Sequence, residues 1–167
     1  GLYLVTDWDL CGGRPLEEVV AAAVDGGASC VQIREKNLST RAFVAEARAI
    51  KKLLADRGVP LIINDRLDVA LAAEADGIHI GQDDMPYPLA RRILGKGKII
   101  GLSVETWEDV EEAEGWDVDY LGVSPIFATP TKTDTRGVWG LDGLTRIRAR
   151  SRHSMVAIGG LNARQAG

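Results

Sequence analysis

The stretch PLIINDRLDVALAAEADGIHI, from Pro60 to Ile80, decides the fold. It begins with a short apolar run, continues through an amphipathic segment at residues 66–74, and returns to a second apolar run at Gly77–Ile80. Two short buried runs separated by a helical pattern are typical of a β-strand, a crossover helix and a second, parallel β-strand. The same order continues in both directions along the chain.

Seven apolar runs alternate with seven amphipathic segments. The predicted strands are Leu2–Val5, Cys30–Ile33, Pro60–Ile63, Gly77–Ile80, Ile99–Leu102, Tyr120–Val123 and Met155–Ile158. The predicted helices cover residues 15–26, 39–57, 66–74, 86–95, 105–115, 141–150 and 161 onward. This alternation predicts an α/β fold with a parallel sheet, and seven units without a long odd connection favour a TIM (β/α)8 barrel over a doubly wound sheet.

The chain is expected to form a single barrel domain over residues 1–167. Seven units are one fewer than a closed (β/α)8 barrel contains. The chain also begins at Gly1 directly before a strand and stops at Gly167 soon after a helical pattern starts. We therefore expect a barrel truncated after its seventh strand and incomplete at both ends.

Composition excludes several classes of protein. The 167 residues carry a net charge of −4 without a basic run, which argues against a nucleic-acid surface. The two cysteines, Cys11 and Cys30, lack metal-binding or CxxC spacing, as expected of a reduced intracellular protein. Because there is no long apolar run and no signal-peptide pattern, a cytoplasmic location without membrane contact is expected.

Several helices carry recognisable start signals. Ser39 or Thr40 precedes the longest helical pattern, and Thr106–Asp109 resembles a capping box. Pro86 or Pro88 is suited to the first turn of the fourth helix.

Polar side chains follow nearly every predicted strand, where parallel α/β folds place their chemistry. In chain order they are Thr6 and Asp7; Gln32, Arg34 and Lys36; Asn64 and Asp65; Gln82, Asp83 and Asp84; Ser103; Ser124, Thr129, Thr131, Lys132 and Asp134; and Gly159, Gly160 and Asn162.

Each of these groups also has an ordinary structural interpretation. The charges of VQIREK (Val31–Lys36) could form a solvated strand face, with its polar residues at alternating positions. Asn64–Asp65 and Asp83–Asp84 stand where they could cap the following helices. His79, between two isoleucines of a strand, is expected to be a core or rim histidine and not a base. Thr129–Lys132 could be a solvated loop.

Taken together, the polar groups favour a polyanion site. Arg34, Lys36 and Lys132 supply positive charge, with a planar fork from the arginine and point charges from the lysines. Asp65 and Asp84 suit Mg²⁺, which takes one or two carboxylates and completes its shell with phosphate oxygens and water. The combination predicts a metal-bound diphosphate between cations and carboxylates.

Two further features lie near the end of the chain. Gly159–Gly160 stands at the predicted start of a helix after the seventh strand, where free N–H groups favour a second phosphate. The composition of Thr133–Trp139 allows a mobile lid. The four tryptophans are expected to be packing residues, with the role of Trp139 left open.

Seven motifs resemble those of the thiamine-phosphate synthase family, within the thiamine monophosphate synthase/TenI superfamily. They are LYLVTD, QIREK, IIND, GIHIGQDD, GLSVET, GVSPIFATPTKTD and AIGGL, and they span nearly the whole chain. The resemblance implies a Mg²⁺-dependent barrel enzyme that joins hydroxymethylpyrimidine diphosphate to thiazole phosphate, giving thiamine phosphate and pyrophosphate. It also implies a dissociative mechanism, in which pyrophosphate leaves before the thiazole nitrogen attacks.

The resemblance assigns roles to individual residues. The pyrimidine diphosphate would be bound by Gln32, Arg34, Lys36, Asn64, Ser103 and Lys132. The thiazole phosphate would be bound by Thr129, Pro130, Thr131 and Gly160. Asp65 and Asp84 would hold Mg²⁺, and the catalytic contribution would come from Arg34, Lys36, Lys132 and Ser103.

Two alternatives remain open from the sequence. A thiazole tautomerase shares the fold but does not need the metal–diphosphate residues. A non-catalytic phosphate-binding fragment would follow from the incomplete barrel. The expected partners are small molecules, with a homo-oligomer among the open alternatives.

Overall fold

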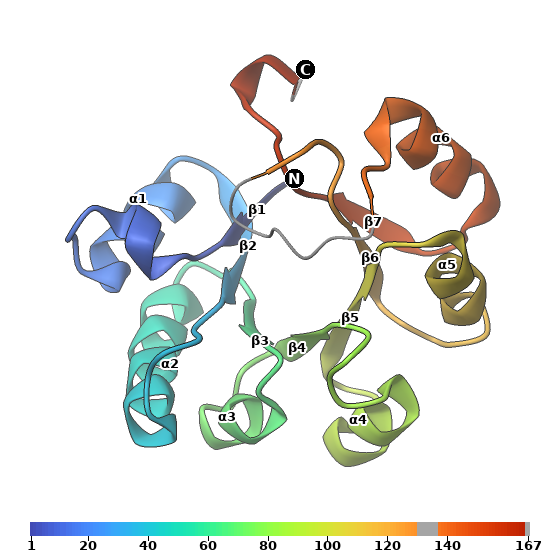
Figure 1. Ribbon diagram of the computed structural model, residues 1–167. Helices are drawn as coiled ribbons and strands as arrows, with labels where there is room; N and C mark the ends of the chain where they lie inside the picture. The colour runs from blue at the N-terminus through green and yellow to red at the C-terminus, as the bar shows by residue number, and fades with distance from the viewer. Residues whose placement is uncertain (130–136, 166–167) are drawn as a thin grey trace. The chain divides into compact units, whose positions relative to one another are not determined.

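The structure is a computed structural model that describes residues 1–129 and 137–165. Strands and helices alternate along the chain, as the sequence predicts (Figure 1). The chain divides into two compact units, residues 1–79 with 90–99 and residues 80–89 with 100–167.

The first unit is built on four parallel strands. They are β1 (Leu2–Val5), β2 (Ala28–Ile33), β3 (Leu61–Asn64) and β4 (Gly77–Ile80). Parallel pairing sets Val5 beside Gln32, Gln32 beside Ile62, and Asn64 beside His79. The residues that follow these strands therefore leave the sheet at the same edge.

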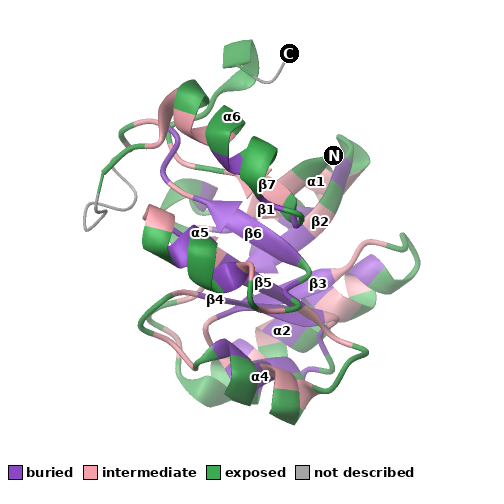
Figure 2. Ribbon diagram, turned by 90° about the vertical axis from the view of Figure 1, so that its right-hand side faces the viewer, coloured by how far each residue is buried: buried purple, intermediate pink, exposed green. Residues whose placement is uncertain are grey.

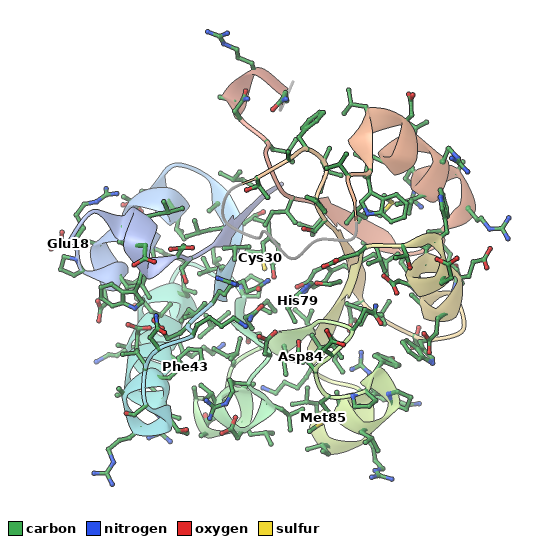
Figure 3. The ribbon with its side chains drawn as sticks, in the orientation of Figure 1. Glu18, Cys30, Phe43, His79, Asp84 and Met85 are labelled. Atoms are coloured by element: carbon green, nitrogen blue, oxygen red, sulfur yellow. The ribbon has the colours of Figure 1, made fainter. Side chains whose placement is uncertain are left out.

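Helices of the first unit cover the outer face of these strands (Figure 1). They are the 3₁₀ helix η1 (Trp8–Cys11), α1 (Leu16–Asp25), α2 (Thr40–Ala55) and α3 (Leu67–Ala72). Buried residues recur on α2 at Phe43, Ala47, Ile50 and Leu54, which is the spacing of one helix face. These side chains belong to the same core as Val31, Ile33, Leu61 and Ile63 of the strands. The burial colouring shows this division between inner and outer faces, and Phe43 is labelled on α2 (Figures 2 and 3).

The second unit repeats the arrangement with strands β5 (Ile99–Val104), β6 (Tyr120–Val123) and β7 (Ser154–Ala157). Parallel pairing sets Ser103 beside Gly122 and Gly122 beside Val156. The helices are α5 (Trp107–Ala113) and α6 (Gly140–Arg150), and α4 (Tyr87–Leu94) has residues in both units.

The predicted start signals are confirmed. The Thr106 side chain accepts from the Asp109 N–H at 3.2 Å, and Asp109 Oδ2 accepts from the Thr106 N–H at 2.9 Å, which is a reciprocal capping box. Ser39, not Thr40, is the N-cap of α2. Pro88 lies in the first turn of α4, directly after Tyr87.

Two elements differ from the prediction. The sequence predicts a helix from residue 161, but the described residues there form only the 3₁₀ helix η2 (Ala163–Gln165). Asn162 Oδ1 accepts from the Arg164 N–H at 3.0 Å and closes this turn. The 3₁₀ helix η1 was not predicted; it is capped by Asp7, whose Oδ1 accepts from the Asp9 N–H at 3.0 Å. Within the described residues, none of the helices is long and apolar enough to cross a bilayer.

Candidate functional site

The side chain of Gln32 is held by Tyr3, which is not among the predicted site residues. Gln32 lies on β2 and is buried, and its Nε2 donates to Tyr3 Oη at 2.9 Å. Burial raises the pKa of the neighbouring Cys30 thiol to about 11, against a hydrogen bond from Tyr3 that lowers it. Because Tyr3 donates to Cys30 and accepts from Gln32, the amide keeps its carbonyl oxygen available as an acceptor. Tyr3 lies on β1, the strand that pairs with the strand of Gln32. The neighbourhood of these two strands is the signal by which the sequence could have indicated Tyr3.

Arg34 and Lys36 lie beyond the end of β2, so only Gln32 of the three donors is on the strand itself. β2 ends at Ile33, as the sequence predicts, so the alternative interpretation of a solvated strand face that runs on to Lys36 is wrong. The Arg34 N–H donates to Thr6 Oγ1 at 3.1 Å, which ties the start of this segment to the end of β1. The Arg34 guanidinium makes no hydrogen bond or ion pair with any residue that the structure describes.

Lys36 and Asp65 form an ion pair, with 2.6 Å between Lys36 Nζ and Asp65 Oδ2. They come from the segments that follow two adjacent strands, β2 and β3. The lysine side chain is 52% exposed and the aspartate side chain 22% exposed. An ion pair this exposed contributes about 0–1 kcal/mol, so both groups can exchange partners at little cost.

Asp65 adopts an unusual backbone conformation, with φ at +59°. Its N–H donates to the His79 carbonyl at 2.8 Å, so the backbone conformation is fixed by β4. The left-handed region costs a non-glycine residue on the order of 1 kcal/mol, although aspartate tolerates it better than most. The N-cap of α3 is Arg66, and the Asp65 carboxylate accepts from Lys36 Nζ. The interpretation of Asn64–Asp65 as a helix cap is therefore wrong.

Asn64 and His79 lie beside each other at the ends of β3 and β4, and both are buried. His79 is buried and interacts with other residues, as expected of a core or rim histidine.

Asp84 stabilises the loop that precedes α4. Its Oδ2 accepts from the Gly81 N–H at 2.7 Å, which closes a tight turn around Gln82 and Asp83. Gln82 Nε2 in turn donates to the Ser103 carbonyl at 2.7 Å, so the loop is tied to β5. Within the second unit, the structure thus brings together the Gln82–Asp84 loop and Ser103, as the motif positions predict.

The two glycines after β7 pack against the segment after β6. Gly159 and Gly160 have φ values of +94° and +68°. A Cβ on Gly159 would lie 2.7 Å from Pro125 Cβ, and one on Gly160 would lie 2.7 Å from the Ala128 carbonyl oxygen. Glycine is therefore required here for close approach of two backbones. The predicted helix N-terminus at Gly160 is wrong for the described residues, since only the short η2 turn follows.

Thr129 is the last described residue of the segment after β6. Pro130, Thr131 and Lys132 lie outside the described residues, as does most of the predicted lid at Thr133–Trp139. Trp139 itself is a packing residue. Its ring lies edge-on to that of Trp107, with 5.3 Å between the ring centroids. Its indole N–H donates to the Val104 carbonyl at 3.3 Å.

Asp65 and Asp84 offer the hard oxygen donors that Mg²⁺ prefers. Among the residues that the structure describes, the Asp65 carboxylate has one side-chain partner, the exposed Lys36 ammonium at Oδ2. No group of three or more metal-binding side chains occurs among residues 1–129 and 137–165. Either carboxylate by itself suits Mg²⁺, which keeps waters and takes substrate phosphate oxygens, better than a metal that requires an all-protein cage.

Comparison with known proteins gives one consistent family. The model of the family described as thiamine monophosphate synthase matches residues 2–167. A thiamine-phosphate synthase from Albidiferax ferrireducens is 60% identical over 167 residues, which is 98% of this chain and 76% of that protein. One from Vibrio campbellii is 53% identical, over 96% of this chain and 78% of that protein.

A solved structure agrees with these relatives. Thiamine phosphate pyrophosphorylase from Pyrococcus furiosus matches with a TM-score of 0.87 at 40% identity, covering 96% of this chain and 75% of that one. This likeness confirms the predicted α/β barrel class of fold, and the part of the chain that the structure describes contributes seven strands to it. The chain belongs to the thiamine monophosphate synthase family.

Proposed function

We propose that this chain condenses hydroxymethylpyrimidine diphosphate with thiazole phosphate, with Mg²⁺, to give thiamine phosphate and pyrophosphate. Membership of the family makes it a transferase of thiamine biosynthesis. The substrates, the metal and the residue roles given below are the proposal.

The observation that carries the proposal is the ion pair between Lys36 and Asp65, 2.6 Å apart. A diphosphate binds a lysine, and Mg²⁺ binds a carboxylate, so a magnesium–diphosphate complex offers each partner of this pair a better ligand. The strained backbone of Asp65 supports a functional role, because such conformations gather at binding sites.

The residues that follow β2 to β5 would bind the pyrimidine diphosphate. Arg34, Lys36 and Lys132 would bind the diphosphate oxygens, and Asn64 and Ser103 would add hydrogen bonds. Gln32, oriented by Tyr3, would offer its carbonyl oxygen to the amino group of the pyrimidine. Thr129, Pro130, Thr131 and Gly160 would bind the thiazole phosphate.

The proposed reaction begins when the bond between the pyrimidine methylene carbon and the diphosphate oxygen breaks. Both bonding electrons leave with pyrophosphate, whose growing charge Arg34, Lys36 and Lys132 stabilise. The remaining cation is stabilised by the pyrimidine amino group, and the lone pair of the thiazole nitrogen forms the new C–N bond. No protein nucleophile is needed, so the chain contributes positioning and charge stabilisation.

Asp65 and Asp84 would hold Mg²⁺, which supplies positive charge to the diphosphate when bound. We expect removal of Mg²⁺ with EDTA to abolish pyrophosphate release and re-addition to restore it. Pyrophosphate release should be measured with the metal and each substrate present or omitted. Release that needs all three supports the proposal, whereas full release without Mg²⁺ contradicts the metal assignment.

A variant tests the diphosphate role directly. We expect Arg34→Ala to lower turnover by about 10²–10³-fold, by analogy with the loss of one charge-stabilising donor in other enzymes. Arg92→Ala is the matched control, because Arg92 is exposed on α4 and makes no hydrogen bond or ion pair with a described residue. Near-normal turnover of a folded Arg34→Ala protein would contradict the assignment of Arg34 to the diphosphate.

A further inference from the structure

The turn after β7 takes its position from the segment after β6. The Ile126 N–H donates to the Ile158 carbonyl, and the Phe127 N–H donates to the Gly159 carbonyl, each at 2.9 Å. Ile126 is fully buried, and a Cβ on Gly160 would lie only 2.8 Å from Phe127 Cβ. Backbone hydrogen bonds and close packing therefore bind the turn to this segment.

The other side of the same segment is bonded to the residues at the start of α6. The Trp139 N–H donates to the Pro125 carbonyl at 3.0 Å, and the Gly140 N–H donates to the Ile126 carbonyl at 2.9 Å. The segment after β6 thus lies between the turn after β7 and the start of α6. A shift of residues 139–140 would be transmitted through this segment to the turn.

The backbone near Trp139 has little conformational restraint of its own. Gly137 and Gly140 flank it, with φ values of +149° and +62°. Glycine loses more conformational freedom than any other residue when it is ordered, so contacts elsewhere must supply the restraint.

The side chain of Trp139 makes such contacts with three elements. Its indole N–H donates to the Val104 carbonyl of β5 at 3.3 Å. Its ring lies edge-on to Trp107 of α5, and the Arg146 guanidinium lies over that second ring, 4.7 Å from the centroid. On α6, a Cβ at Gly143 would lie 3.1 Å from Trp139 Cβ, so the tryptophan packs closely on this glycine. Together these contacts fix the backbone of residue 139.

The turn after β7 carries two N–H groups suited to a phosphate. Within the described part of the chain, neither the Gly159 N–H nor the Gly160 N–H donates a hydrogen bond. Successive N–H groups in a turn form a concave site for an anion. Gly160 is a proposed contact of the thiazole phosphate, and a hydrogen bond weakens steeply when its donor is misaligned. The turn must therefore be held in place to bind a phosphate.

We propose that Trp139 is a positioning residue for the turn at Gly159–Gly160. Its side chain, anchored on Val104 and Trp107, holds the start of α6 against the segment after β6, and that segment holds the turn. Without this anchor, the hydrogen bonds between the segment and the turn open more often. The effect on the substrate rests on the proposed contact between Gly160 and the thiazole phosphate.

Hydrogen exchange of the Phe127 amide reports on the turn without any substrate, because this N–H is bonded to the Gly159 carbonyl. Leu121 is the internal reference, since its amide lies in the buried strand β6 and reports opening of the whole unit. Trp139→Phe removes the indole N–H and keeps an aromatic ring. We expect it to raise the exchange rate of Phe127 relative to Leu121 by about 5-fold, the effect of one lost hydrogen bond. Trp139→Leu also removes the ring contact and should raise this ratio on the order of 10-fold or more.

Trp116→Phe is the matched control. Trp116 is half-buried, as Trp139 is, and it stacks on Tyr87 in the same unit, with 5.3 Å between the ring centroids. Among the described residues it has no hydrogen bond to the segment after β6. This control should keep the wild-type exchange ratio. A wild-type ratio in both Trp139 variants, or an equal rise in Trp116→Phe, overturns the inference.

Steady-state kinetics separate this inference from the proposed function. We expect Trp139→Phe to raise the KM for the thiazole phosphate about 5-fold. The KM for the pyrimidine diphosphate should change less than about 2-fold, because most of its proposed contacts belong to the first unit. Faster Phe127 exchange with an unchanged KM for the thiazole phosphate would leave the positioning of the turn standing and contradict the phosphate contact of Gly160.

Discussion

At the scale of single residues, this chain orients polar side chains with neighbours that have no direct part in the proposed chemistry. Tyr3 holds the Gln32 amide, and the Thr6 hydroxyl holds the Arg34 backbone. Both partners come from β1 and the residue that follows it, directly beside β2 in the sheet. Residues on or just after β2 are thus held by residues on or just after the neighbouring strand β1.

Removal of the Tyr3 hydroxyl tests whether Gln32 needs this hydrogen bond. We expect Tyr3→Phe to raise the KM for the pyrimidine substrate about 5-fold with little change in kcat, because the loss of one hydrogen bond is worth about 1 kcal/mol. Steady-state kinetics will measure both values.

Tyr87→Phe is the matched control for that experiment. It removes a tyrosine hydroxyl that donates to the Asp117 carbonyl, in the other unit of the chain. This variant should leave the KM unchanged. Equal KM values for wild type and Tyr3→Phe would show that Gln32 needs no orientation by Tyr3.

At the scale of elements, the helices α2 and α5 begin where side chains cap them. The box formed by Thr106 and Asp109 fixes the start of α5, and Ser39 fixes the start of α2. These signals are local, so the sequence predicts them directly. The turn after β7 is different, because its shape depends on the backbone after β6.

Gly159 should tolerate no side chain. We expect Gly159→Ala to destabilise the protein by about 2 kcal/mol or more, from a left-handed φ of +94° and a Cβ that would lie 2.7 Å from Pro125 Cβ. That change corresponds to a drop in Tm of roughly 4–8 °C. Thermal unfolding followed by circular dichroism measures it.

Gly97→Ala serves as the control for Gly159→Ala. A Cβ at Gly97 would meet no atom within 4 Å, and its φ is not left-handed. Its Tm should stay within about 1 °C of wild type. A similar loss of stability in both variants would contradict the argument from close packing.

At the scale of the whole molecule, Glu46 links stability to pH. Burial first, and then the charges of Glu35 and Glu17, raise its folded-state pKa from 4.5 to about 7, so the folded chain prefers the protonated form. The stabilisation is therefore full below about pH 4.5 and is lost as pH rises through 7.

We expect the Tm of the wild type to fall by roughly 1–3 °C between pH 6 and 8 relative to that of Glu46→Gln. Differential scanning calorimetry of both proteins at each pH measures the difference. Parallel Tm curves for the two proteins would mean that Glu46 does not titrate in this range.

Much of this protein follows from its sequence alone. Apolar runs such as Leu61–Ile63 and Gly77–Ile80, separated by amphipathic segments, predict the strands, the helices and the α/β barrel class, because hydrophobic period and turn residues act locally. The order of polar residues after each strand also predicts which side chains belong to the candidate site, since parallel strands release their carboxyl ends at one edge.

Tertiary structure alone decided how those side chains are held. Asp65 could have capped α3, but its left-handed backbone and the nearness of Lys36 give its carboxylate a different partner. Tyr3 became a support for Gln32 only through the pairing of β1 with β2. Such partners lie far apart in the chain, and burial and backbone geometry, which no local pattern encodes, select among them.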